Sequence, residues 1–171
     1  MARMSLAVAA VATMFLSGCS AAGGRDSSCL TNSTLRFGME RLRADYGWVC
    51  CDNHNWAEPS GSYRSPTDPL AALPADEPLT FYDPACGAPL FVLPGTGHRS
   101  RQQFLQESAA HGWPSFRDGE LTSHVKVESG GEVVSSCGTH LGHNIPDGTG
   151  NRYCINLLCI SGPEPKEDEL E

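Results

Sequence analysis

The sequence has little positive charge, few aromatic side chains and no Cys-x-x-Cys motif. Its 171 residues carry 12 Lys and Arg against 20 Asp and Glu, a net charge of −8. A chain without excess cations cannot neutralise phosphates, which argues against a nucleic-acid partner. Aromatic residues make up only 8%, and Gly 18 with Pro 12 predicts many turns and short strands rather than a helical bundle. The length is that of one ordinary domain with its own core.

The sequence also lacks an apolar run long enough to span a membrane. Residues 6–16 (LAVAAVATMFL) form a run of about eleven, and a bilayer takes roughly 20. Behind Arg3, this run has the proportions of a secretory signal. It continues into Leu16-Ser17-Gly18-Cys19, which resembles the bacterial lipobox, a signal whose cysteine is lipidated and becomes the mature N-terminus. The alternative is an ordinary signal cut after Ala21 or Ala22.

Either signal places the chain in a secreted or extracytoplasmic compartment, anchored as a lipoprotein through Cys19 if the lipobox is used. Disulfide bonds persist in such compartments. The chain has eight cysteines, and the loss of Cys19 as a thiol leaves an odd number. At least one thiol therefore stays unpaired, which in a secreted chain indicates intermolecular pairing or a nucleophile.

The residue pattern divides the chain into four parts. We expect a signal peptide over 1–19, a tether and short helix over 20–45, a folded domain over 46–162 and an acidic disordered tail over 163–171. The helix is predicted from an apolar stripe at helical spacing. Its members are Leu35, Met39, Leu42 and Tyr46, after a candidate Ser33 cap.

Within the domain, alternating and apolar segments predict strands. We expect strand texture from Leu79 and over 89–93, and a hairpin of 124–128 with 132–136 around a Gly-rich turn. The last strand is predicted over 152–160. A helix over 100–111 is predicted from a capping box, Ser100 with Gln103, at its start and Gly112 at its end.

Three sequence blocks in the C-terminal half carry residues with chemical potential. They are Gly112-Trp113-Pro114-Ser115-Phe116, His140-Leu141-Gly142-His143 with Pro146-Asp147-Gly148, and Arg152-Tyr153-Cys154-Ile155-Asn156. Each block alone is typical of an ordinary core strand or turn. In this order, and with Cys86-Gly87-x-Pro89-Leu90-Phe91 upstream, they make the chain resemble the peptide-methionine (R)-S-oxide reductase family, the B-type methionine sulfoxide reductases, over roughly residues 45–162.

The resemblance implies an all-β fold of two antiparallel sheets with a few short peripheral helices. It also implies reduction of methionine-R-sulfoxide, free or in oxidised proteins, as a repair activity under oxidative stress. By resemblance, Cys154 is the nucleophile, and the reaction leaves it as a sulfenic acid. His140 and His143 occupy the positions of the family's acid pair. Histidine suits this role because it titrates in the range needed to protonate the sulfoxide oxygen.

Three further residues are assigned to the site by the same resemblance. Asn156 lies two residues after Cys154, on the same face of a strand, and matches an asparagine that holds the site's hydrogen bonds. Trp113 resembles the indole that receives the S-methyl group of the substrate, and Phe116 extends that apolar wall.

The sequence departs from the family at the zinc site that many members build from two Cys-x-x-Cys pairs. Cys86 and Cys137 keep the second position of each pair, but Asp83 and Val134 occupy the first positions. Valine binds no metal, so a four-cysteine site is absent and we expect a zinc-less variant without a cofactor. If the fold still brings Cys86 and Cys137 together, they form a disulfide in an oxidising compartment. A weaker ion held by both thiols and Asp83 is the alternative.

A second departure concerns the resolving cysteine that many members carry just before their GWPSF block, where this chain has His111. Cys159 follows Cys154 by five residues, about 16 Å along an extended strand and on its opposite face, too far for a disulfide. The resolving candidates are therefore Cys50 and Cys51, and after them Cys29.

Two alternatives to an internal resolving thiol stay open. An external thioredoxin-like reductant can react directly with the sulfenic acid. The cluster Cys50-Cys51-x-x-His54 has two interpretations of its own. It fits part of a metal site, or one of its two cysteines forms a disulfide with Cys29.

The predicted partners are methionine sulfoxide, free or in oxidised proteins, and the reductant, with the chain acting as a monomer. Two other functions compete with this interpretation. The domain could be catalytically degenerate, binding methionine sulfoxide or serving as a disulfide-stabilised scaffold. It could also be a general thiol oxidoreductase, which the absence of a Cys-x-x-Cys motif weakens.

Overall fold

The computed structural model describes residues 48–52, 57–61, 64, 70, 71, 73 and 78–162. The predicted signal, tether, first helix and acidic tail lie outside these residues. No helix in the described part is long and apolar enough to cross a membrane. The elements, in chain order, are η3 (Trp48–Asp52), β1 (Leu79–Tyr82), β2 (Pro89–Leu93), α2 (Arg101–His111), β3 (Ser115–Phe116), η5 (Asp118–Glu120), β4 (Val125–Val127), β5 (Glu132–Ser135), β6 (His140–Asn144), β7 (Tyr153–Ile155) and η6 (Leu157–Cys159).

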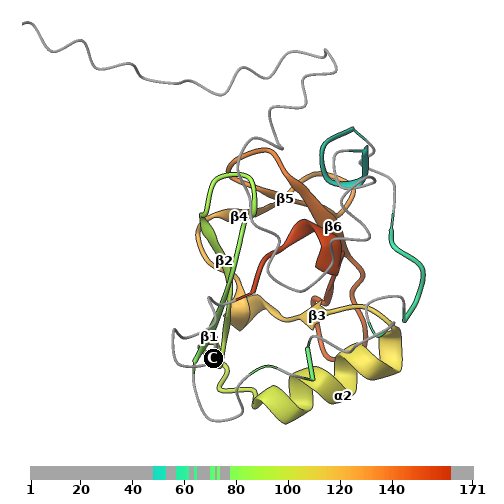
Figure 1. The fold of residues 1–171 in the computed structure, drawn as a ribbon. Coiled ribbons are helices and arrows are strands. Elements are labelled where there is room, and N and C mark those ends of the chain that lie inside the picture. The colour runs from blue at the N-terminus through green and yellow to red at the C-terminus, as the bar shows by residue number, and fades with distance from the viewer. Residues whose placement is uncertain are drawn as a thin grey trace, which may run out of the picture.

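The strands form two antiparallel sheets (Figure 1). The smaller sheet pairs β1 with β2, and the larger one has the order β3-β7-β6-β5-β4. The short strand β7 therefore lies between β3 and β6. The predicted class, an all-β fold of two antiparallel sheets with short helices, is confirmed.

Local sequence signals set several of these elements as predicted. Strand β2 matches the apolar segment 89–93, and β4 and β5 pair as the expected hairpin. The hairpin turn contains Gly130 and Gly131 with φ of 100° and 88°, angles that residues with a Cβ rarely adopt. A Gly-rich turn between two alternating segments is thus enough to place this hairpin.

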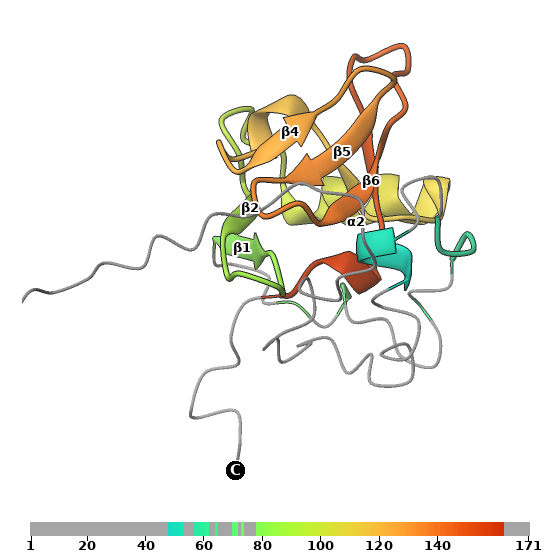
Figure 2. The ribbon, with the colours of Figure 1, turned by 90° about the horizontal axis from the view of Figure 1, so that it is seen from above.

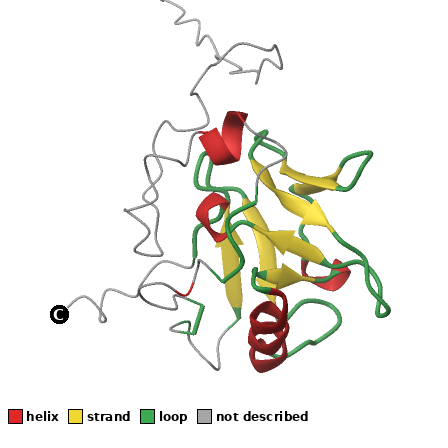
Figure 3. Cartoon of the chain, turned by 90° about the vertical axis from the view of Figure 1, so that its right-hand side faces the viewer, coloured by secondary structure: helices red, strands yellow, loops and turns green. Residues whose placement is uncertain are grey.

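Helix α2 begins and ends where its capping residues predict. The Ser100 hydroxyl accepts a hydrogen bond from the Gln103 backbone N–H, and the Gln103 side chain accepts one from Ser100 N–H. Gly112 ends the helix with φ 86°. The helix lies beside β3 (Figure 3) and buries Phe104.

Four phenylalanines join the two sheets and α2 into one core. Phe116 of β3 stacks on Phe91 of β2 with ring centroids 4.1 Å apart, and it also contacts Phe81 and Phe104 at 5.3 and 4.9 Å. All four rings have an exposed fraction of 0%. The core therefore fixes β3, and through it β7, against the smaller sheet.

The final strand is shorter than predicted. Residues 152–160 were expected to form one strand, but β7 covers only Tyr153–Ile155 and the chain then turns into η6. Apolar run length alone does not reveal this turn. The Glu58 carboxylate accepts a hydrogen bond from Leu157 N–H, and Cys159 is bonded to Cys50 of η3. Figure 2 shows η3 beside η6, so contacts distant in sequence end the strand.

Candidate active site

One row of side chains crosses the larger sheet at β7. Ser115 of β3 is the Cα partner of Cys154, Cys154 is the partner of His143 on β6, and Glu132 of β5 is the partner of His143 on its other side. Directly opposed residues of antiparallel strands project from the same face, with Cβ atoms about 4.5–5.5 Å apart. The sheet register therefore places a thiol between a hydroxyl and an imidazole.

A bulge in β6 brings the second histidine to the same place. Residues three apart on a regular strand point to opposite faces. The pairing with β5 shifts by one residue here, because Val133 pairs with Gly142 but Val134 pairs with His140. The His140 and His143 rings consequently lie 5.2 Å apart, centroid to centroid.

The glycine of this bulge allows a close approach of β6 to β7. A Cβ on Gly142 would lie 2.0 Å from the carbonyl oxygen of Cys154, so no larger residue fits. His140 is fully buried, and its Nδ1 lies 3.1 Å from a carboxylate oxygen of Glu132. A carboxylate at this distance favours the tautomer with the proton on Nδ1, and it orients the ring.

Cys154 is the free thiol among the described cysteines, and its exposed fraction is 9%. Burial raises the pKa of the Cys154 thiol, because a thiolate loses hydration there. Arg152 and the Ser115 hydroxyl act in the opposite direction. Arg152 Nη1 lies 2.8 Å from Cys154 Sγ, so a thiolate has a guanidinium partner as soon as it forms.

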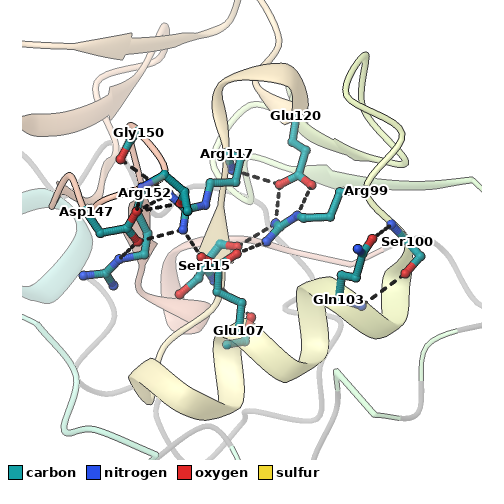
Figure 4. Close-up of polar contacts among 12 residues, drawn as sticks. Arg99, Ser100, Gln103, Glu107, Ser115, Arg117, Glu120, Asp147, Gly150 and Arg152 are labelled. Atoms are coloured by element: carbon teal, nitrogen blue, oxygen red, sulfur yellow. Dashed lines mark hydrogen bonds and ion pairs between the residues drawn. The ribbon is translucent and has the colours of Figure 1, made fainter.

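Arg152 belongs to a chain of alternating charges that reaches α2 (Figure 4). Its Nε lies 3.3 Å from Asp147 Oδ2, and the same oxygen is 2.7 Å from Arg117 Nη2. The Glu107 carboxylate pairs with both Arg117 and Arg99. Hydrogen bonds from Arg117 hold the pKa of Asp147 well below its usual range. The thiol therefore lies at the end of a fixed ionic network.

Trp113 and Asn156 are both held by one residue from a distant segment, Glu58. Trp113 Nε1 donates to the carbonyl oxygen of Glu58 at 2.6 Å, and Glu58 N–H donates to Asn156 Oδ1 at 3.0 Å. The Trp113 side chain is partly exposed, whereas Asn156 is buried. The indole and the amide of these two predicted site residues thus have fixed orientations relative to Glu58.

Phe116 does not line the site, and this prediction was wrong. The residue follows Ser115 on β3, so its side chain points to the face opposite Ser115 and Cys154. It has an exposed fraction of 0% and packs in the phenylalanine core. The sequence motif places Phe116 near the nucleophile along the chain, but strand alternation turns it away.

Cys86 and Cys137 form a disulfide with a Cα–Cα distance of 6.5 Å. Their sulfurs and a carboxylate oxygen of buried Asp83 lie within 4.8 Å of one another. The two sulfurs are bonded to each other, so neither is a thiolate that could bind a metal. With this disulfide formed, Asp83 alone remains as a ligand in this group.

The predicted resolving cysteines are not free thiols in the described structure. Cys50 is bonded to Cys159 with a Cα–Cα distance of 5.5 Å, and Cys51 is disulfide-bonded as well. The expectation that Cys50 or Cys51 provides a resolving thiol is therefore corrected, as is the metal interpretation of this pair with His54. His54 and Cys29 lie outside the described residues. The argument that separated Cys159 from Cys154 assumed one extended strand through both residues, and it does not apply because Cys159 lies in η6.

Several residues of the site were not singled out from the sequence. Arg152 had a usable signal, since it precedes Cys154 by two residues in the predicted strand 152–160, where the two residues share a face. Ser115 and Asp147 belong to the sequence blocks named above, but no role for either residue follows from the sequence. No local signal pointed to Glu58 or Glu107, because their contacts depend on how distant segments pack.

Comparisons with known proteins agree on one family. The SelR domain family matches residues 72–162. A protein of Saccharophagus degradans called peptide methionine sulfoxide reductase MsrB is 31% identical over 144 residues, covering 78% of this chain and 93% of the relative. A Pseudomonas putida protein of the same name is 38% identical over 129 residues, covering 73% of this chain and 70% of the relative. One from Methylibium petroleiphilum is 40% identical over 93 residues, covering 48% and 59%.

Proposed function

The chain belongs to the MsrB family of SelR-domain proteins, and on that premise we propose that it reduces methionine-R-sulfoxide through the thiol of Cys154. The observation that carries the proposal is the position of this thiol. Cys154 is unbonded, while the other cysteines in the described part are in disulfides. Its Sγ lies 2.8 Å from Arg152 Nη1, and the residue lies directly opposite His143 of the neighbouring strand β6.

The reaction follows from these neighbours. The Cys154 thiolate, paired with Arg152, attacks the electrophilic sulfur of the sulfoxide. His140 and His143 transfer a proton to the sulfoxide oxygen as negative charge develops on it. The protonated oxygen then bonds to Cys154 Sγ, while both the new sulfur–sulfur bond and the sulfur–oxygen bond of the substrate break, so that Cys154 becomes a sulfenic acid and methionine leaves. Trp113 contacts the S-methyl group and Asn156 fixes the polar side of the site.

Two thiols of an external thioredoxin-like reductant then reduce the sulfenic acid to the thiol, with release of water and formation of a disulfide. Direct attack by the reductant is favoured because Cys50 and Cys159 are bonded to each other and both have an exposed fraction of 0%. The substrate is methionine sulfoxide in oxidised proteins or as the free amino acid.

The proposal also covers the compartment of the protein and the place where many relatives hold zinc. We place the chain outside the cytosol, as a monomer that is either secreted or anchored through Cys19. The Cys86–Cys137 disulfide, beside Asp83, takes the structural role that zinc has in many relatives, so the reaction needs no cofactor other than the reductant. The disulfides of the described part support an oxidising compartment.

Single-turnover chemistry tests the proposal without a reductant that would break the structural disulfides. The native protein is mixed with the separate R and S diastereomers of a methionine sulfoxide peptide. We expect about one equivalent of methionine from the R form only, together with a sulfenic acid on Cys154 that dimedone traps. Cys154→Ser should yield none. A folded native protein that binds the peptide but converts neither diastereomer would instead support the degenerate, binding-only function.

A further inference from the structure

Glu58 contacts the site through three different groups. Its carbonyl oxygen accepts the Trp113 indole N–H, its backbone N–H donates to Asn156, and its carboxylate Oε1 accepts Leu157 N–H at 2.7 Å. The residue is buried, with an exposed fraction of 2%. A single residue thus joins the two sides of the site.

The segment around Glu58 is docked on the same turn that carries Trp113. Gly61 N–H donates to the carbonyl oxygen of Gly112 at 2.7 Å. A Cβ on Gly112 would lie 1.9 Å from the Ser60 hydroxyl, so the two chain segments touch closely. Any shift of Glu58 is therefore transmitted to the indole next to Gly112.

The carboxylate is the anchor that a substitution can remove. Asn156 begins η6 without a side-chain cap of its own, and the Glu58 carboxylate accepts the first N–H of that turn instead. The other carboxylate oxygen, Oε2, is buried without a hydrogen-bond partner among the described residues. A buried carboxylate is costly to keep, and this one faces the backbone N–H groups of Leu157 and Leu158, which makes a purely space-filling part a poor explanation for it.

We propose that Glu58 is a positioning residue that sets the spacing between the Trp113 indole and the Asn156 amide, and thereby the fit of the methionine sulfoxide side chain. This inference rests on the proposed function. Glu58 touches neither Cys154 nor the histidines in the described contacts, so it affects substrate fit and not thiol reactivity. Small errors in the placement of binding groups weaken complexes strongly.

The experiment compares Glu58→Ala with the conservative Glu58→Gln, whose amide oxygen can still accept Leu157 N–H. We expect Glu58→Ala to raise KM for the R-sulfoxide about tenfold, the loss expected for roughly one well-placed hydrogen bond. Alkylation of Cys154 by iodoacetamide should keep its native rate, and Glu58→Gln should stay within about twofold of the native KM.

Asp83→Ala provides a matched control in another region. Asp83 is also buried, accepts one backbone N–H, from Ala85, and has a second oxygen without a hydrogen-bond partner among the described residues. It lies at the Cys86–Cys137 disulfide. Its substitution removes the same chemical group and should leave KM unchanged. If Glu58→Ala does not fold, Glu58→Asp, which is one methylene too short to keep all three contacts, replaces it.

A spectroscopic signal separates this inference from the proposed function. The indole N–H signal of Trp113, identified among three tryptophans by its absence in Trp113→Phe, should move upfield in Glu58→Ala and stay in place in Glu58→Gln and Asp83→Ala. An active native protein combined with an unmoved signal, or with equal KM values for Glu58→Ala and Asp83→Ala, overturns the assignment of Glu58 alone. A native protein that reduces neither diastereomer overturns the proposed function, and the assignment to substrate fit with it.

Discussion

Two of the cysteine-containing regions in the described part of the chain differ in what surrounds the sulfur. Around Cys154, the larger sheet supplies a hydroxyl and two imidazoles, Arg152 just before β7 supplies a guanidinium, and the thiol has no cysteine partner. Around Cys86 and Cys137, two turns bring the sulfurs together beside buried Asp83, and they form a disulfide. Both regions contain a buried carboxylate that accepts hydrogen bonds from the backbone, Glu58 in the first and Asp83 in the second.

The difference teaches that the fold, and not the cysteine itself, decides between chemistry and stability. Cys154 lies in the middle of three strands, where register fixes its neighbours and keeps other cysteines away. Cys86 and Cys137 lie in loops, outside the strands. Substitutions in the two regions should therefore separate activity from stability.

The largest expected effect is a contrast between two cysteine variants, one of which loses activity while the other loses stability. Cys154→Ser should abolish sulfoxide reduction and change the free energy of unfolding by less than about 1 kcal/mol. The paired variant Cys86→Ser/Cys137→Ser opens a loop with a sequence separation of 51, which costs about 4 kcal/mol in the chain-entropy description. Single-turnover activity of this variant, measured below its melting temperature, should remain. Denaturant unfolding measures the stability of the two variants, and methionine release measures their activity. Loss of activity in a folded disulfide variant would mean that the two regions are coupled.

The next effect concerns the stability of the first region as a function of pH. Burial raises the pKa of Glu58 from 4.5 to about 7. The folded protein thus holds this proton more tightly than the unfolded chain, so the contribution to stability is full below pH 4.5 and is lost as pH rises through about 7. The shift corresponds to about 3 kcal/mol. Glu58→Gln should remove this slope between pH 5 and 8.

Urea unfolding at several pH values measures that slope. Asp83→Asn, which removes the other buried carboxylate, is the control for the substitution itself. If the native protein and Glu58→Gln lose stability in parallel above pH 5, the buried Glu58 does not titrate there.

A smaller effect is expected from the cation beside the thiol. Arg152→Gln removes a cation that lowers the pKa of Cys154, whereas burial raises that pKa. The thiol pKa should rise further, and sulfoxide reduction at pH 7 should fall about ten- to a hundredfold, the range for a hydrogen bond to a charged group. The pH dependence of iodoacetamide alkylation measures the change directly. Arg101→Gln is the control, since Arg101 donates to the carbonyl oxygens of Leu70 and Ala71. Equal pH profiles for Arg152→Gln and the native protein would contradict the pairing.

Local patterns predicted most of the fold. Strand β2, the β4–β5 hairpin and the caps of α2 follow from neighbouring residues, because short-range signals determine turns and helix ends. The end of β7 did not follow, because a carboxylate and a disulfide partner from far upstream turn the chain there.

The site could be predicted only as far as its motifs reach. Cys154, Trp113 and the two histidines stand out as residue types, but the bulge that brings His140 beside His143 cannot be read from alternation. Phe116 is next to Ser115 in its motif, but strand alternation turns its ring away from Cys154 and into the core. Glu58 and Glu107 belong to no sequence motif, and their roles follow only from tertiary contacts with distant residues.

The smallest effect has the opposite sign to that of Arg152→Gln and distinguishes two ways in which the ionic network can act. Glu107 raises the pKa of Cys154 through its negative charge, and it also holds Arg117, which in turn pairs with Asp147. If charge decides, Glu107→Gln lowers the thiol pKa and speeds alkylation at pH 7 about threefold, the size of a screened surface interaction. If orientation decides, loss of the Arg117 contact loosens Asp147 and Arg152, and alkylation slows. Glu128→Gln, at an exposed position in the β4–β5 turn, should leave the rate unchanged. We expect the faster rate, because Arg152 keeps its own contact with Asp147, so that removal of Glu107 changes the net charge near Cys154 more than the direction of the guanidinium.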